Sequence, residues 1–275
     1  MSVDLTPSSP SSPSSPSAEP FLRPGPPRTR AWIAMYHSVA DPTDDPYRIT
    51  VSPDRLAAQL RWLRRRGLRG VSMRQLLDAC ARGQERDLVG LTFDDGYRDF
   101  VDEAVPLLRS HDCSATLFVL PGRLDGDNAW DPLGPRKPLL GAAGIRRAAE
   151  YGMEIASHGL THVDLTQADD RLLRREVSDS RAALAELTGT DVQGFCYPYG
   201  HVDERVTAAV RDAGYRYACA ISPGPLSGVL ALPRVHIGQS DTAPRLRLKL
   251  WTNRLRHRTL DRVAVAPAVT SAVTG

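Results

Sequence analysis

The chain of 275 residues is 41% hydrophobic, and its 35 Lys and Arg residues exceed its 32 Asp and Glu residues by only three. This length and apolar content are enough to bury one large core, whereas a surplus of three positive charges is too small to predict nucleic acid as a partner. The four cysteines are widely separated and form no C-x-x-C pair, so we expect free thiols and neither a zinc ribbon nor a disulfide framework.

Residues 1–30 form a tail of biased composition, with eight Pro and eight Ser. Such a segment cannot bury enough apolar surface to offset the entropy of ordering, so it is predicted to be disordered, with a proline-rich recognition segment as the alternative. The tail lacks the basic-then-apolar pattern of a secretory signal, and no apolar run in the chain approaches the ~20 residues of a membrane helix. A cytoplasmic location is therefore the expectation.

From about Arg30 onward, short apolar runs alternate with amphipathic segments, which is typical of alternating strands and helices. The apolar runs predict strands at Trp32–Val39, Leu88–Phe93, Ala115–Leu120, Glu154–Ser157, Gly194–Tyr197, Tyr217–Ile221 and Val235–Gly238. The amphipathic segments predict helices at Asp54–Arg66, Met73–Ala81, Tyr97–Ser110, Gly144–Tyr151, Asp169–Leu187 and Glu204–Ala213. Pro106 is expected to kink or interrupt the third helix, because proline has no N–H to donate.

Apolar runs that are nearly continuous, such as Trp32–Met35, are typical of parallel strands covered by helices. Seven or so strand–helix units predict an α/β barrel, complete or incomplete. Polar groups follow four of the predicted strands, at Tyr36-His37, Asp94-Asp95, Ser157-His158 and Tyr197–Gly200. Because the active sites of parallel α/β folds gather at the carboxyl ends of the strands, these four groups predict a single site.

The stretch Leu91–Tyr97, LTFDDGY, places two carboxylates side by side at the end of a predicted strand. Neighbouring side chains of a strand point to opposite faces, so Asp94 and Asp95 can serve one centre only where the chain turns, which Gly96 permits. Two carboxylates this close are comfortably ionised together only beside a cation. The pair therefore indicates a bound metal, with a helix cap and a solvated neighbour as the structural alternative.

His158 and His162 have the i, i+4 spacing that, in a helical turn, places both imidazoles on one side and within reach of one ion. Two structural histidines are the alternative. With one aspartate, the pair supplies three protein ligands. Three ligands leave one position open for water or substrate, as in catalytic zinc sites.

Three motifs, TFDDG at Thr92–Gly96, SHGLTH at Ser157–His162 and YPYG at Tyr197–Gly200, resemble those of the polysaccharide deacetylase family, the carbohydrate esterases with a NodB homology domain. The motifs occur in the family's order, and the resemblance covers roughly residues 32–238. It implies a distorted (β/α)7 barrel of the NodB type, and a divalent metal, usually zinc, as the cofactor.

The resemblance also assigns roles to residues. It implies that Asp95, His158 and His162 hold the metal. It implies that Asp94 is the general base and that the backbone N–H of Tyr199 helps the metal to stabilise the oxyanion. Such a division of labour would explain the adjacent aspartates, since one coordinates the metal and the other accepts a proton from the same water.

The acid that protonates the leaving amine is assigned by a fourth similarity. YHSV at Tyr36–Val39 resembles the Y-H-x-V of the branch that includes poly-N-acetylglucosamine deacetylases, which implies His37 as the acid. His236 lies where the family's late histidine falls and is the competing candidate. Many members have Arg where this chain has Cys196, so an Arg that would orient the base is missing there, and no counterpart of the family's fourth motif follows Tyr199.

The implied reaction is metal-dependent removal of N-acetyl groups from an amino sugar or polysaccharide, which makes an N-acetylated glycan the expected partner. An O-acyl esterase and a glycan-binding relic without turnover are the alternatives. A phosphohydrolase with an aspartyl nucleophile is disfavoured, because that chemistry typically uses Asp-x-Asp and would leave both histidines unexplained.

The sequence divides into the tail at 1–30, a catalytic domain at 31–242 and a basic C-terminal helix and tail at 243–275. Residues 243–262 hold seven basic residues and one acid, which predicts a solvated surface helix with Leu246, Leu250 and Trp251 inward. Contact with an anionic membrane surface or an anionic glycan is the alternative. Asp125–Lys137, which contains Trp130, is predicted to be a substrate loop.

Overall fold

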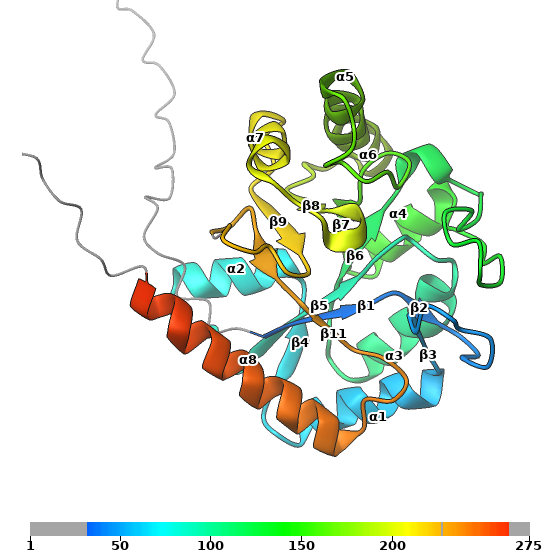
Figure 1. The fold of residues 1–275 in the computed structure, drawn as a ribbon. Helices are drawn as coiled ribbons and strands as arrows, with labels where there is room; N and C mark the ends of the chain where they lie inside the picture. Colours follow the sequence, from blue (N-terminus) through cyan, green and yellow to red (C-terminus); the bar gives the residue numbers. More distant parts are fainter. Residues whose placement is uncertain (1–31, 227, 264–275) are drawn as a thin grey trace, which may run out of the picture.

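The computed structural model describes residues 32–226 and 228–263, and a parallel sheet lies at its centre (Figure 1). The tail predicted at 1–30 lies outside the described residues. The sheet consists of β1 (Trp32–Tyr36), β4 (Arg69–Val71), β5 (Leu88–Phe93), β6 (Thr116–Val119), β7 (Glu154–Ser157), β8 (Gly194–Cys196), β9 (Tyr217–Ala220), β10 (Leu232–Pro233) and β11 (Val235–His236). The strand order is β10-β9-β8-β7-β6-β5-β1-β11, with β4 also paired to β5, and these pairings are parallel.

One extended segment, residues 232–236, joins the two edges of the sheet. Its first two residues, β10, pair with β9, and its last two, β11, pair with β1. The sheet therefore nearly closes into a barrel, which confirms the predicted fold class. Arg234 lies at the point where the segment changes its partner.

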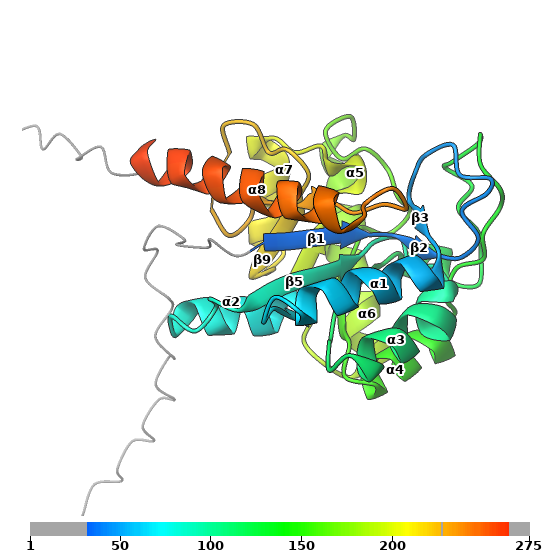
Figure 2. The same ribbon diagram turned by 90° about the horizontal axis from the view of Figure 1, so that it is seen from below.

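Helices cover the outside of this barrel (Figures 1 and 2). Their bounds are α1 (Pro53–Arg64), α2 (Met73–Ala81), α3 (Val105–Ser110), α4 (Ala142–Glu150), α5 (Asp170–Arg174), α6 (Ser180–Thr188), α7 (Glu204–Asp212) and α8 (Ala243–Val263). A π-helical turn at Phe100–Ala104 precedes α3, so the predicted interruption near Pro106 is present as a widened turn. A second π-helical turn, Arg175–Asp179, joins α5 to α6.

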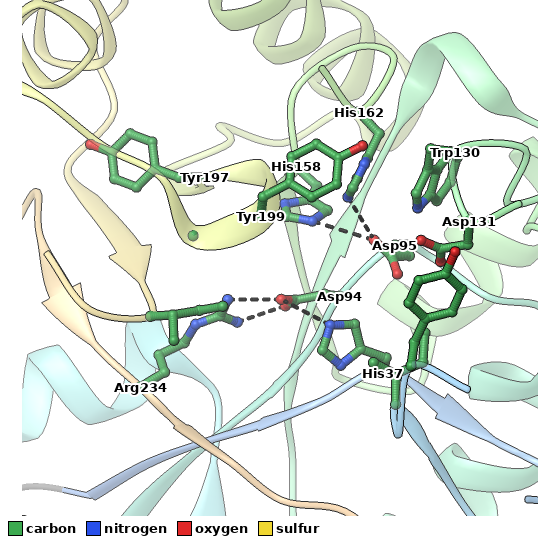
Figure 3. Close-up of a pocket in the computed structure, with 14 residues that line it drawn as sticks. His37, Asp94, Asp95, Trp130, Asp131, His158, His162, Tyr197, Tyr199 and Arg234 are labelled. Atoms are coloured by element: carbon green, nitrogen blue, oxygen red, sulfur yellow. Dashed lines mark hydrogen bonds and ion pairs between the residues drawn. The ribbon is translucent and has the colours of Figure 1, made fainter. Parts of the chain in front are cut away.

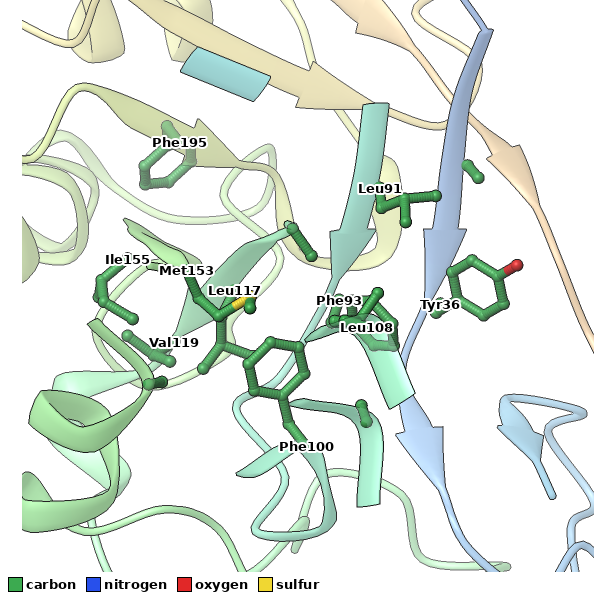
Figure 4. Packing of buried hydrophobic residues seen from close by; sticks show 14 of the residues in the cluster. Tyr36, Leu91, Phe93, Phe100, Leu108, Leu117, Val119, Met153, Ile155 and Phe195 are labelled. Carbon is green, nitrogen blue, oxygen red and sulfur yellow. The ribbon is translucent and has the colours of Figure 1, made fainter. Parts of the chain in front are cut away.

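Successive residues of the strands pack on opposite faces of the sheet, as the two-residue period of a strand requires. Leu117 of β6 and Phe195 of β8 belong to the large core between the sheet and the helices (Figure 4). Their neighbours Phe118 and Cys196 belong to a second cluster inside the barrel. Burial on both faces explains why the strands read as continuous apolar runs.

Helix α2 covers the amino end of the barrel. The Glu154 carboxylate, buried at the start of β7, accepts hydrogen bonds from the Arg74 N–H (2.9 Å), the Thr116 hydroxyl (2.6 Å) and the Tyr217 hydroxyl (2.9 Å). An anion at a helix N-terminus is favourable, and this buried carboxylate is fully paired. The amino end of the barrel is thus filled, which leaves the carboxyl end for a site.

The first predicted strand, Trp32–Val39, is wrong at its end, because the chain leaves the sheet at His37. Ser38 and Val39 form the short strand β2 (Ser38–Val39), which pairs with β3 (Thr50–Val51) in a separate two-stranded sheet. Asp99 holds this turn, since its carboxylate accepts bonds from the Ser38 hydroxyl (2.6 Å) and the Val39 N–H (3.0 Å). The break turns His37 out of the sheet and toward the pocket.

The C-terminal helix α8 lies along the outside of the barrel (Figure 2). Leu246 is buried as predicted, but Trp251 was expected inward and is 58% exposed. The reason is helical geometry, because five residues at about 100° each place Trp251 about 140° away from Leu246. No helix within the described ranges has both the length and the apolar character needed to span a membrane. Contact of α8 with a membrane surface stays a prediction.

Candidate active site

The polar groups that follow β1, β5, β7 and β8 meet in one pocket (Figure 3). The pocket has a volume of about 190 Å³ and lies at the carboxyl ends of the strands. Six predicted site residues line it, namely His37, Asp94, Asp95, His158, His162 and Tyr199. His236, the seventh, is not among the described residues that line it.

Asp95 lies between the two histidines of the second motif. Its Oδ1 atom is 3.4 Å from Nε2 of His158 and 3.4 Å from Nε2 of His162, and all three side chains are buried. Burial alone would raise the pKa of Asp95, but the two imidazoles outweigh it and hold that pKa well below its usual value. An ionised carboxylate therefore faces two ring nitrogens.

The three side chains fit a divalent cation. Among the described residues, Oδ1 of Asp95 has no hydrogen-bond partner although it is buried. Nδ1 of His158 donates to the Cys196 carbonyl at 2.9 Å, so in the neutral ring the lone pair of Nε2 points toward Asp95. Because the lone pairs of the carboxylate and the imidazoles face one another, protons or one cation must lie between them. Two imidazoles with one carboxylate are a typical ligand set for zinc. His158, His162 and Asp95 could thus hold a metal together.

The helical turn predicted for His158–His162 is wrong, because this segment is a loop. Gly159 has a φ of 82° and His162 a φ of 67°, both in the left-handed region. The buried Glu176 carboxylate holds the loop by accepting the N–H groups of Leu160 (2.7 Å) and Thr161 (2.9 Å), together with the Thr161 hydroxyl. The loop therefore brings the two imidazoles together. Glu176, which holds the loop, was not predicted from the sequence as a site residue.

Backbone strain is concentrated in this pocket. Six described residues other than glycine have positive φ, and three of them, Asp95 (72°), His162 (67°) and Tyr199 (59°), belong to the site. A left-handed conformation costs about 1–3 kcal/mol for such residues and persists where the surrounding structure imposes it, often at functional sites. The fold therefore holds one residue of each motif in an unfavourable backbone conformation.

Arg234 lines the pocket and was not predicted from the sequence as a site residue. Its Nη1 donates to Oδ1 of Asp94 at 2.6 Å and its Nη2 donates to Oδ2 at 2.7 Å, and both residues are buried. Burial would raise the pKa of Asp94, but the charge and hydrogen bonds of Arg234 outweigh it and hold the pKa below its usual value. Asp94 is therefore ionised and fixed in direction. The sequence did contain a signal for this pair, an arginine inside the apolar strand segment LPRVHI. Because arginine is almost never fully buried unless it is paired, its presence there indicates a buried acidic partner.

Cys196 contacts this ion pair. Its Sγ atom is 3.0 Å from Nη2 of Arg234 and 3.7 Å from Oδ2 of Asp94. The arginine expected at position 196 is thus replaced by one that reaches Asp94 from residue 234. Asp94, His158 and Cys196 also lie close enough to bind a metal, but the guanidinium already supplies the positive charge there and would repel a cation.

The two candidate acids lie at different distances from the reacting centre. Nε2 of His37 is 3.8 Å from Oδ2 of Asp94, and the ring lines the pocket. The centre of the His236 ring lies 6.3 Å from that of His37, and His236 is not among the described residues that line the pocket. Burial lowers the pKa of His37, and Asp94 and Asp95 oppose this only in part. The geometry favours His37 over His236.

Comparison with known proteins gives a consistent picture. Residues 81–218 match the family model described as polysaccharide deacetylase. YxkH of Bacillus subtilis is 26% identical over 218 residues, which cover 77% of this chain and 73% of that protein. The poly-beta-1,6-N-acetyl-D-glucosamine N-deacetylase of Staphylococcus aureus is 20% identical over 74% of this chain and 72% of its own length.

The fold is also similar to a solved structure, the Streptococcus pyogenes deacetylase PplD in complex with acetate. The two superpose with a TM-score of 0.69 at 24% sequence identity, over 80% of this chain and 97% of PplD. At this level of identity the likeness concerns the fold. It agrees with the nearly closed parallel barrel described above.

Proposed function

The chain belongs to the polysaccharide deacetylase family, and we propose that it removes N-acetyl groups from an amino sugar or polysaccharide with a divalent metal, an aspartate base and a histidine acid. The enzyme class is hydrolase acting on carbon–nitrogen bonds other than peptide bonds. One observation carries the proposal: Asp95, His158 and His162 converge on one point, and the ionised Asp94 lies beside them in the same pocket.

Zinc is the metal that we propose for the three ligands, because two imidazoles and one carboxylate leave a fourth tetrahedral position open. A metal bound there would lower the pKa of a coordinated water toward ~7 and polarise the acyl carbonyl. The chain's own residues must then supply a base, a donor to the oxyanion and an acid.

Asp94 suits the role of base. Its carboxylate is ionised, and the two hydrogen bonds from Arg234 fix its orientation in the pocket that Asp95 also lines. The proton of the attacking water would pass to this carboxylate. The left-handed turn at Tyr199 supports the assignment of its backbone N–H as a donor to the developing oxyanion, since such turns can direct amides into a site.

His37 suits the role of acid, although its lowered pKa leaves the ring neutral at rest. A neutral ring must gain a proton before it can protonate the leaving amine. Asp94 holds a proton after the attack, and its Oδ2 is 3.8 Å from Nε2 of His37. Transfer along this path would return one proton from water to the amine, with no net proton taken from solvent.

The pocket bears on the size of the substrate. Its volume of about 190 Å³ is below the ~300–1,000 Å³ typical of pockets that enclose a whole small-molecule ligand, so we expect it to take the acylated part of one sugar unit. A longer glycan would have to lie across the mouth. Tyr199 and Tyr47, both partly exposed at this mouth, offer aromatic surfaces for sugar rings.

The proposed function predicts that the purified protein releases acetate from at least one form of N-acetylglucosamine. We suggest a panel of monomer, oligomers, and lipid- and nucleotide-linked forms, assayed with and without a chelator. Release should stop with chelator and return when Zn²⁺ is added. Release from O-acetyl esters alone would favour the esterase, glycan binding without release would favour the relic, and metal-independent release would refute the mechanism.

The assignment of the acid predicts different results for two histidine variants. H37A should lose roughly 10²- to 10⁴-fold in kcat, the usual contribution of a general acid, because the leaving amine has no donor. H236A should stay within a few-fold of wild type, because His236 is not among the described residues that line the pocket. The reverse pattern in the acetate assay would transfer the role of acid to His236.

A further inference from the structure

The two histidines of the candidate metal site are held in different ways. Nδ1 of His158 donates to the Cys196 carbonyl at 2.9 Å, which fixes the direction of its Nε2. Nδ1 of His162 is buried and has no hydrogen-bond partner within the described part of the chain. Histidines that bind a metal almost always donate from their second nitrogen, because this bond fixes the ring. Something else must therefore hold His162.

Besides the ring of His158, its fellow candidate ligand, two aromatic rings contact His162 directly. The Trp130 ring stacks on the imidazole, with ring centres 4.5 Å apart and an angle of 18° between the planes. The Tyr199 ring meets the imidazole nearly edge to face, at 4.6 Å and 72°. His162 lies between these two rings (Figure 3), so rotation of its ring is blocked by packing.

The loop that carries Trp130 is anchored away from the metal ligands. Nζ of Lys137 donates to the hydroxyls of Ser38 (2.9 Å) and Thr50 (2.6 Å), both on the small β2–β3 sheet. The Leu133 N–H donates to the Tyr47 hydroxyl at 3.1 Å. The loop that carries Trp130 is therefore held by contacts that do not involve His162, so the indole can serve as a wall for the imidazole.

We infer that Trp130 is a positioning residue for the metal: together with Tyr199, its ring holds His162 in the ligand orientation in place of the missing hydrogen bond. The segment predicted as a substrate loop, Asp125–Lys137, would then belong to the metal site as well. This inference rests on the proposed function, because it assumes that His162 binds the metal.

The alternative role for Trp130 is a stacking platform for a sugar ring. The two roles predict different results. Loss of a sugar platform would raise KM and leave the affinity of the metal unchanged, whereas loss of a positioning ring would weaken metal binding with no substrate present.

The test is titration of the metal-free full-length protein with Zn²⁺, followed by calorimetry, for wild type and three variants. W130A should bind Zn²⁺ roughly 10- to 100-fold more weakly, the usual effect of removing an outer support of a ligand histidine. W130F keeps a ring against the imidazole and should stay within about threefold of wild type. W251A, which removes an exposed tryptophan from α8, is the matched control and should not change the affinity.

Two further measurements keep the result decisive. Thermal unfolding of the metal-free variants checks that W130A is folded, and W130S, which also removes the packing of the ring, replaces it if it is not. Equal Zn²⁺ affinity of wild type and W130A, or of wild type and W130S, overturns the inference while leaving the proposed function intact. Failure of wild type to bind Zn²⁺ would instead refute the proposed metal site.

Discussion

D94N should bind Zn²⁺ as wild type does but release acetate roughly 10²- to 10⁴-fold more slowly, the range expected for loss of a general base. The amide keeps the shape of the carboxylate and can still accept a hydrogen bond from Arg234, but it cannot take the proton of water. Asp94 is not among the three side chains that converge as metal ligands, so the metal content should not change. Calorimetry and the acetate assay measure the two quantities separately.

D95A provides the contrast, because it should lose metal and activity together. This substitution removes the Asp95 carboxylate, whose Oδ1 lies 3.4 Å from Nε2 of both His158 and His162. D102N, on an exposed aspartate of the π-helical turn, is the matched control and should retain both. The assignment fails if D94N keeps its rate, or if D95A binds Zn²⁺ as tightly as wild type.

The parts of the fold that local patterns describe were predictable. Strands β5 and β7 and helix α2 have the predicted bounds, since each is an apolar or amphipathic run with clear ends. Strands β3, β4 and β10 have only two or three residues, and no period can be recognised over such a length. They form because neighbouring strands supply hydrogen-bond partners for their backbones. A short window of sequence does not contain that information.

The same limit applies to the site. Both aspartates and both histidines lie in short motifs at strand ends, so the sequence alone was enough to predict that they meet in one site. Arg234 was missed because it is 140 positions away from Asp94, and Glu176 because it supports its loop from the neighbouring helix. The helical turn expected for His158–His162 failed because i, i+4 spacing states only which residues are near in sequence, and a loop with left-handed residues can serve the same purpose.

The Arg234–Asp94 pair also explains how the chain manages without an arginine at position 196. A buried carboxylate needs a positive partner, and the strand that switches from β9 to β1 carries one into the barrel. The small Cys196 side chain leaves room for the guanidinium, which lies 3.0 Å from its sulfur. The position and the charge of the Asp94 carboxylate, the proposed base, are therefore set by the same segment that closes the sheet.

R234M should destabilise the protein by about 3–5 kcal/mol, because it leaves the ionised Asp94 carboxylate buried without a partner. It should also slow acetate release on the order of 10²-fold, since the base is no longer held in one orientation. Urea denaturation of the metal-free protein gives the free energy of unfolding, and the acetate assay gives kcat.

The double variant D94N/R234M separates charge from packing. With no carboxylate to leave unpaired, it should be more stable than R234M alone, and the coupling free energy from the double-mutant cycle should be large and favourable for the wild-type pair. Strictly additive effects of D94N and R234M would mean that the two side chains contribute independently. In that case the stability lost in R234M would come from the other contacts of the guanidinium, with Thr92 and the Ala220 carbonyl, and Arg234 would not be what keeps Asp94 ionised.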